Sequence, residues 1–151
     1  MSHEHSIALS PNEQRSLRCL LGLMIPASTA FSVPGADDDA IFADILASLG
    51  RDIGHAHDAL RTLDGLAGGA FADLDPARRW LVAEAFRDAG GVPLMFLTRV
   101  ILQCYYRDDR VMCSLGMEPR PPFPKGFDVE QGDWTLLDPV RARPAFYREA
   151  T

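Results

Sequence analysis

Two histidines placed two positions apart are the residues of this chain that most suggest metal chemistry. His55 and His57 lie in a segment whose apolar spacing predicts a helix. Residues two apart on a helix diverge by about 200°, so one helix cannot aim both imidazoles at the same ion. His3 and His5 lie near the N-terminus and form at most a weak surface chelator. The sequence therefore predicts no metal site.

The cysteines suggest packing rather than chemistry. Cys19, Cys104 and Cys113 form neither a CxxC pair nor a CxxCH haem attachment, and three are too few for a disulfide framework. Their odd number leaves at least one thiol without an intramolecular partner, which suits a reducing compartment. We expect all three to be buried thiols that pack as small apolar side chains.

Catalytic and nucleotide-binding motifs are absent from the sequence. It contains no GxGxxG turn, no phosphate loop and no GxSxG nucleophile elbow. The acidic run at residues 37–39 lacks the alternating ligands and closing glutamate of a calcium-binding loop. We interpret it as the solvated start of a helix, where the helix dipole favours negative charge. We therefore expect no catalytic and no cofactor-binding residue in this chain.

Length and composition predict one globular domain. The chain has 151 residues, of which 47% are hydrophobic and 24% charged, enough to bury a continuous core. Its net charge is −6, and the basic residues are scattered, so a nucleic-acid partner is not expected. No apolar run reaches the roughly 20 residues that span a bilayer.

Local signals predict where the helices begin and end. Residues 10–13 form a capping box with proline at the first helical position, so a helix is expected over residues 11–24. A second helix follows residues 37–39 and closes at Gly50 in a left-handed conformation. A third begins near Ile53, and the glycines at positions 65, 68 and 69 are expected to stop it.

Three more helices are expected before residue 116. One begins at Asp75-Pro76 and turns Trp80 and Leu81 toward the other helices. The next follows Pro93 and is apolar on nearly every side, which predicts a central helix, with a buried strand as the competing interpretation. A short helix near residues 110–115 ends at Gly116. The predicted class is all-α, a single small bundle of about five to six helices.

A proline-rich and aromatic arm is expected to follow this bundle. We divide the chain into a flexible N-terminus (1–9), a helical domain (10–116) and an extended C-terminal arm (117–151) in which prolines block helix formation. Because the arm is rich in aromatic residues, we expect it to lie on a protein surface, either that of this chain or that of a partner. The candidate interface residues are Phe123, Phe127, Trp134, Arg141, Arg143, Phe146 and Tyr147.

Four segments carry a resemblance to a known family. They are LMIPAS, YYRDDRVMCSLG, PPFPKGF and GDWTLLDPVRARP. With them the chain resembles gluconate 2-dehydrogenase subunit 3 and related small subunits, over the first helix and loop and over most of residues 105–147. The resemblance implies a partner, a large flavoprotein of the glucose-methanol-choline oxidoreductase type that binds FAD and oxidises an alcohol or sugar hydroxyl. A cytochrome or other electron acceptor is sometimes a third component.

These observations lead to two competing functions. The first is a non-catalytic small subunit that stabilises and clamps the large FAD-containing subunit, with no cofactor of its own. The second is a stand-alone helical ligand-binding protein or small enzyme with an unrecognised pocket. Many relatives carry a twin-arginine leader, and this sequence has no paired arginines before an apolar stretch near its start. We therefore expect the protein to stay in the cytoplasm. The alternative is that it is exported to the periplasm together with a partner that carries the leader.

Overall fold

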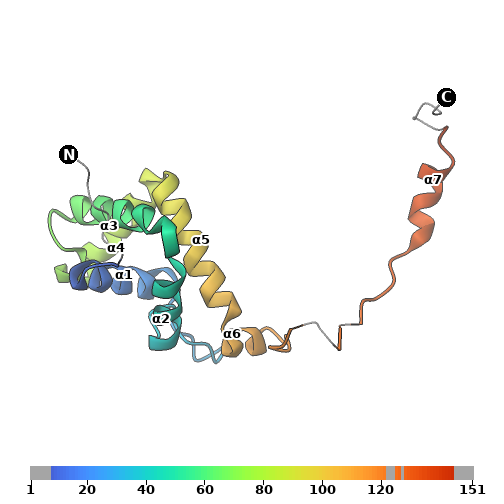
Figure 1. The fold of residues 1–151 in the computed structure, drawn as a ribbon, viewed down its shortest axis with the longest axis horizontal. Helices are drawn as coiled ribbons and strands as arrows, with labels where there is room; N and C mark the ends of the chain where they lie inside the picture. The colour runs from blue at the N-terminus through green and yellow to red at the C-terminus, as the bar shows by residue number, and fades with distance from the viewer. Residues whose placement is uncertain (1–7, 122–124, 127, 145–151) are drawn as a thin grey trace. The chain divides into compact units, whose positions relative to one another are not determined.

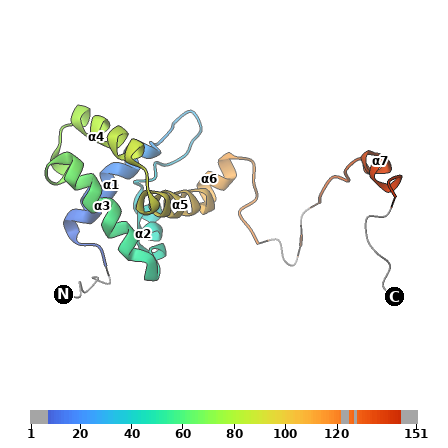
Figure 2. The same ribbon diagram turned by 90° about the horizontal axis from the view of Figure 1, so that it is seen from above.

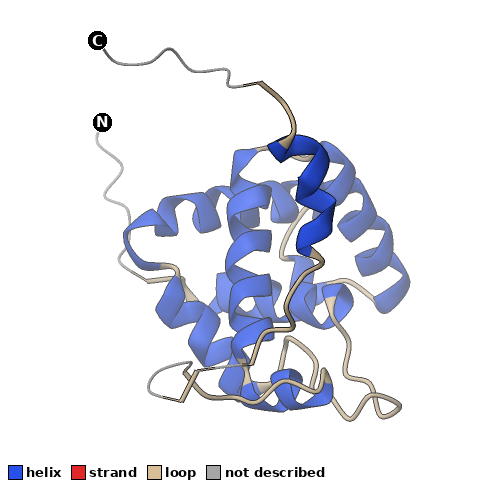
Figure 3. Cartoon of the chain, turned by 90° about the vertical axis from the view of Figure 1, so that its right-hand side faces the viewer, coloured by secondary structure: helices blue, strands red, loops and turns tan. Residues whose placement is uncertain are grey.

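The computed structural model describes residues 8–121, 125–126 and 128–144, and these residues are all-α. They form seven α-helices and no strand, which confirms the predicted class and excludes the strand considered after Pro93 (Figure 3). The chain divides into two compact units, Met1–Pro119 and Arg120–Thr151. None of the described helices is long and apolar enough to cross a membrane.

The first unit contains six α-helices and two 3₁₀ turns (Figures 1 and 2). Their bounds are α1 Pro11–Met24, α2 Asp39–Ser48, η1 Gly50–Asp52, α3 Ile53–Ala67, η2 Phe71–Asp73, α4 Pro76–Ala89, α5 Val92–Arg107 and α6 Asp109–Ser114. Two helices organise this unit, because α3 contacts α1, α4 and α5, and α5 also contacts α2 and α6. Fully buried leucine and isoleucine side chains of α1, α2, α3 and α5 form its core.

The helix starts follow the predicted capping signals. Ser10 and Glu13 form the capping box, in which the Ser10 Oγ accepts from the Glu13 N–H at 3.3 Å and the Glu13 Oε2 accepts from the Ser10 N–H at 2.8 Å. Asp38 caps α2 through the N–H groups of Ala40 and Ile41. Asp75 caps α4, with Pro76 at its first position. These caps satisfy backbone donors that a helix leaves unpaired at its start.

Two expectations about the helices are wrong. Gly65 does not stop the third helix, which continues to Ala67 and ends at Gly68 with a left-handed φ of 70°. Trp80 and Leu81 are not buried against the other helices, since the two residues are 53% and 63% exposed. The fifth helix is central, as predicted, because it contacts α2, α3 and α6, although its outer side is open and Met95 there is 70% exposed. In this small unit, the neighbouring helices cover only one side of α4 and one side of α5, and the opposite side of each helix is open to solvent.

The second unit contains two short helical segments, so the expectation of an arm without helix is wrong. They are η3 Trp134–Leu137 and α7 Asp138–Arg141. Pro139 lies in the first turn of α7, where the missing N–H of proline costs no hydrogen bond. Asp133 caps η3, because its side chain accepts from the Thr135 N–H at 3.0 Å. Proline thus starts a helix here rather than preventing one.

Candidate partner interface

The second unit exposes large apolar side chains. Every described residue from 128 to 144 is exposed, including Trp134 at 60% and Leu136 at 74%. The indole Nε1 of Trp134 donates to the Gln131 side chain at 3.3 Å, which holds the ring in place without covering it. A unit of this size with two short helices offers its own apolar side chains no core. These exposed side chains are therefore candidates for contact with another surface, either elsewhere in this chain or on a partner.

The predicted interface residues are only partly within the described part of the chain. Trp134, Arg141 and Arg143 are described, and all three are exposed. Arg141 forms an ion pair with Asp138 at 3.3 Å, one helical turn away. The other predicted residues lie outside the described residues: Phe123, Phe127, Phe146 and Tyr147.

The motif YYRDDRVMCSLG has an internal structural role. The Tyr105 hydroxyl donates to the Pro34 carbonyl at 3.2 Å and so ties α5 to the loop between α1 and α2. Arg107 donates from Nε to the Asp44 carboxylate at 2.7 Å and from its terminal nitrogen to Ser48 at 2.7 Å. These bonds fasten α2 to the end of α5, so this part of the motif builds the fold.

Arg110 completes this corner of the first unit. Its guanidinium lies 2.7 Å from Asp38 and 2.9 Å from Asp108, the residues that cap α2 and α6. Hydrogen bonds from Arg110 hold the pKa of both carboxyl groups below their ordinary value, and the pKa of Arg110 is raised in turn. The motif that carries the family resemblance therefore fixes the two helix starts relative to each other.

The three cysteines differ in exposure. Cys104 is 1% exposed, and burial raises the pKa of its thiol, so it packs as predicted and is a poor nucleophile. Cys113 is exposed, which corrects the expectation that it is buried. It lies on the short helix α6, whose one buried residue is Val111. Cys19 is partly buried beside the α1 core residues.

His57 makes an acid–base contact within the helical unit. Its Nδ1 lies 2.6 Å from the Glu13 Oε1, and both side chains are largely buried. Burial raises the pKa of Glu13, but hydrogen bonds from His57 and Ser10 outweigh it and leave that pKa lowered. His55 instead packs beside the Phe96 ring, with ring centroids 5.4 Å apart. Among the described residues, no three histidine, cysteine, aspartate or glutamate side chains are grouped as metal ligands.

An apolar groove lies between α1, α4 and α5, where the sequence predicted only core packing. It has a volume of about 350 Å³, and we call it the α1–α4 groove. Its large apolar lining residues are Leu20, Leu23, Met24, Trp80, Phe86 and Leu94. The one sequence signal for it is the mixed surface of α4, where Trp80 and Leu81 directly follow Arg78 and Arg79.

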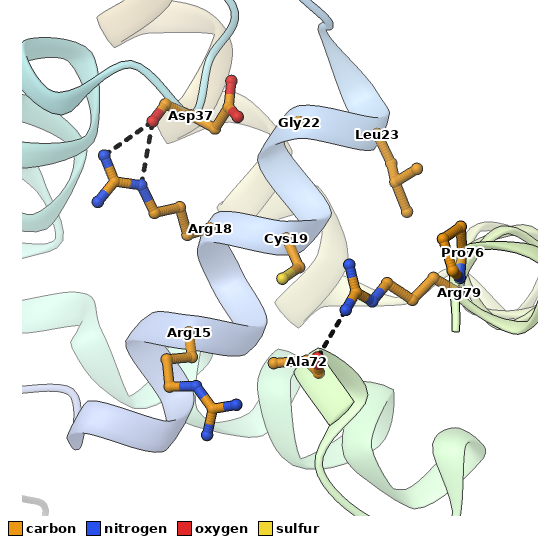
Figure 4. Close-up of a pocket in the computed structure, with 9 residues that line it drawn as sticks. All are labelled: Arg15, Arg18, Cys19, Gly22, Leu23, Asp37, Ala72, Pro76 and Arg79. Carbon is orange, nitrogen blue, oxygen red and sulfur yellow. Dashed lines mark hydrogen bonds between the residues drawn. The ribbon is translucent and has the colours of Figure 1, made fainter. Parts of the chain in front are cut away.

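A second hollow adjoins this groove and shares Leu23 with it. We call it the arginine pocket; its volume is about 480 Å³, and its lining includes Arg15, Arg18, Cys19, Leu23, Asp37 and Arg79. Figure 4 shows Arg79 reaching from α4 toward Cys19 of α1 and donating to the Ala72 carbonyl, a bond of 2.7 Å. Arg18 donates to the Asp37 carbonyl at 3.0 Å and is paired with Asp39.

Comparisons of the chain with protein-family models, with curated proteins and with solved structures found no match. The function is therefore inferred from the residues and their arrangement. The family resemblance of the four motifs stays a prediction.

Proposed function

We propose that the chain is a non-catalytic small subunit of a flavin-dependent alcohol or sugar dehydrogenase. Its second unit, residues 120–151, clamps the large FAD-containing subunit of the glucose-methanol-choline type. One observation carries this proposal: the described part of that unit exposes Trp134, Leu136 and Val140 and offers no core for them. A cytochrome or another electron acceptor would be a third component of such a complex.

The composition of the second unit suits a clamp. Its prolines restrict the free chain, so less conformational entropy is lost when it docks. Tryptophan and other large side chains supply the buried area of interface hot spots. Arg141 and Arg143 add charged contacts at the rim, where exposed pairs are each worth at most about 1 kcal/mol. Aromatic anchors should therefore dominate the binding energy.

Co-purification with and without the second unit tests the proposal. The full chain and a chain ending at Pro119 are each mixed with a large glucose-methanol-choline-type flavoprotein from the same genome and analysed by gel filtration. We expect the full chain to co-elute with the flavoprotein. The shorter chain should keep its helical content and melting temperature but elute alone.

Each other result contradicts a definite part of the proposal. Equal binding by the shorter chain would show that residues 120–151 are not the clamp. A collapsed melting temperature would show that they cover this chain's own helices. If the full chain binds no flavoprotein but carries a bound small molecule when purified alone, the alternative of a stand-alone binding protein or small enzyme replaces the proposed function.

A further inference from the structure

We infer that the α1–α4 groove is a second docking site for the large flavoprotein, and that it receives a segment with a bulky apolar side chain beside an acidic one. This inference rests on the proposed function, but it concerns the first unit and not residues 120–151. Its basis is the juxtaposition of an apolar groove with a pocket whose Arg79 has no carboxylate partner among the described residues.

The groove leaves a large aromatic side chain uncovered. Trp80 lines it and is 53% exposed, whereas Phe86, which lines it from the same helix, is 3% exposed. A tryptophan at the edge of an apolar hollow is the kind of residue that contributes most to protein interfaces. Trp80 therefore favours an occupant that brings apolar surface of its own.

The size of the groove argues for side chains rather than a cofactor. About 350 Å³ is near the lower end of the range of small-molecule pockets, which is roughly 300–1,000 Å³. FAD is larger than such a hollow can bury, and the groove has no glycine-rich turn to receive a pyrophosphate. One or two bulky side chains of a partner segment would fill it.

The charges around the groove indicate that the occupant has an acidic side chain and show on which side of its apolar residue that side chain lies. Arg15 is paired with Asp73, and Arg18 with Asp39. Arg79 has no carboxylate partner in the described part of the chain, and its Nε is buried without a hydrogen bond there. A carboxylate placed in the arginine pocket would pair with the Arg79 guanidinium through a charge-assisted hydrogen bond.

The groove itself disfavours an acidic side chain. Glu84 lines the groove, and Arg87, which also lines it, is paired with Asp88 at 3.0 Å. A partner carboxylate would meet repulsion from Glu84 there, whereas the arginine pocket attracts it. The acidic residue of the segment must therefore lie on the Arg79 side of the apolar residue.

Fluorine NMR on the labelled small subunit tests this inference within the complex. The chain contains two tryptophans, so 5-fluorotryptophan gives two signals, which Trp80→Phe and Trp134→Phe assign. The unlabelled flavoprotein adds no signal. We expect its addition to shift or broaden the Trp80 signal, because the partner segment covers the ring.

Matched substitutions on α4 identify the chemistry of the occupant. Trp80→Ala should weaken binding about tenfold or more, whereas Leu81→Ala, exposed but outside the groove, should change it less than about twofold. Arg79→Gln should weaken binding and reduce its salt dependence more than Arg78→Gln does. Melting temperatures of the four variants verify that each is folded.

The outcomes separate this inference from the function on which it rests. If no complex forms with the full chain, the proposed function fails, and the inference falls with it. If a complex forms while the Trp80 signal stays unchanged and Trp80→Ala binds like Leu81→Ala, only the second docking site is overturned. If Arg79→Gln and Arg78→Gln have equal effects on binding, the inference that the occupant carries an acidic side chain is overturned.

Discussion

At the scale of single residues, Arg110 makes the stability of two helix starts depend on pH. It holds the carboxylates of Asp38 and Asp108, each of which also caps a helix. The pKa of both carboxyl groups is lower in the folded chain than its ordinary value of 3.8. A lowered folded pKa means that the ionised group stabilises the fold above that ordinary value. This stability is lost as the pH falls through the lowered pKa.

Asp38→Asn separates the ion pair from the cap. Asparagine still caps α2, so the variant should lose only the pair with Arg110, at most about 1 kcal/mol of the free energy of unfolding at pH 7. Urea unfolding at pH 7 and at pH 3 measures this, and the difference from the unmodified chain should shrink at pH 3. Asp38→Ala loses the cap as well and should cost about 1 kcal/mol more. A difference that does not depend on pH would contradict the role of the charge.

The cysteines should react in the order of their exposure. Because Cys113 is exposed and Cys104 is 1% exposed, a thiol reagent should modify Cys113 in the folded chain and Cys104 only after unfolding. Mass spectrometry after timed labelling would follow each site. Cys113→Ser should remove the fast phase. Fast labelling of Cys104 in the folded chain would show that the corner formed by α2 and α5 opens readily.

At the scale of the elements, two glycines should respond in opposite directions to an added methyl group. Gly65 lies exposed inside α3 with no atom near its missing Cβ, so Gly65→Ala should raise the free energy of unfolding by about 0.5–1 kcal/mol. At Gly35 a Cβ would lie 2.9 Å from the Ala27 backbone nitrogen, so Gly35→Ala should lower it by about 1–3 kcal/mol. Chemical unfolding measures both.

Gly68 provides the control for this comparison. It ends α3 with a φ of 70°, a conformation that residues with a side chain adopt at a cost. Gly68→Ala should therefore destabilise the chain even though no atom lies near its missing Cβ. If it stabilised the chain as Gly65→Ala is expected to, the helix would not end at Gly68.

At the scale of the whole molecule, the proposed role is support of a partner rather than catalysis. A subunit that binds only the folded flavoprotein stabilises it by mass action, by about 2.7 kcal/mol at a hundredfold excess over Kd. The melting temperature of the flavoprotein should therefore rise with the concentration of this chain. The small subunit by itself should show no flavin absorbance, since its described residues contain no strand for a βαβ dinucleotide site. A stoichiometric flavin in the purified chain would overturn this prediction.

The helix boundaries were largely predictable because the signals that set them are local. The capping box at Ser10 and the Asp75-Pro76 pair act on backbone groups within three or four residues, and α1 and α4 begin where these signals predict. The effects of glycine and proline were predicted wrongly where they depend on the position of the residue within a helix. Gly65 lies inside a helix that its neighbours sustain, and Pro139 lies in a first turn that tolerates it.

The sequence by itself determined the helical class and most helix starts, whereas it left open whether Trp134 packs on this chain or on a partner. Only the tertiary structure decided which apolar side chains stay uncovered. Trp80 and Cys113 were expected to be core residues, but both are exposed: Trp80 lies in the open α1–α4 groove, and Val111 is the one buried residue of α6. The α1–α4 groove and the arginine pocket escaped prediction for the same reason. Burial depends on how segments far apart in the chain meet, and no spacing within one segment contains that information.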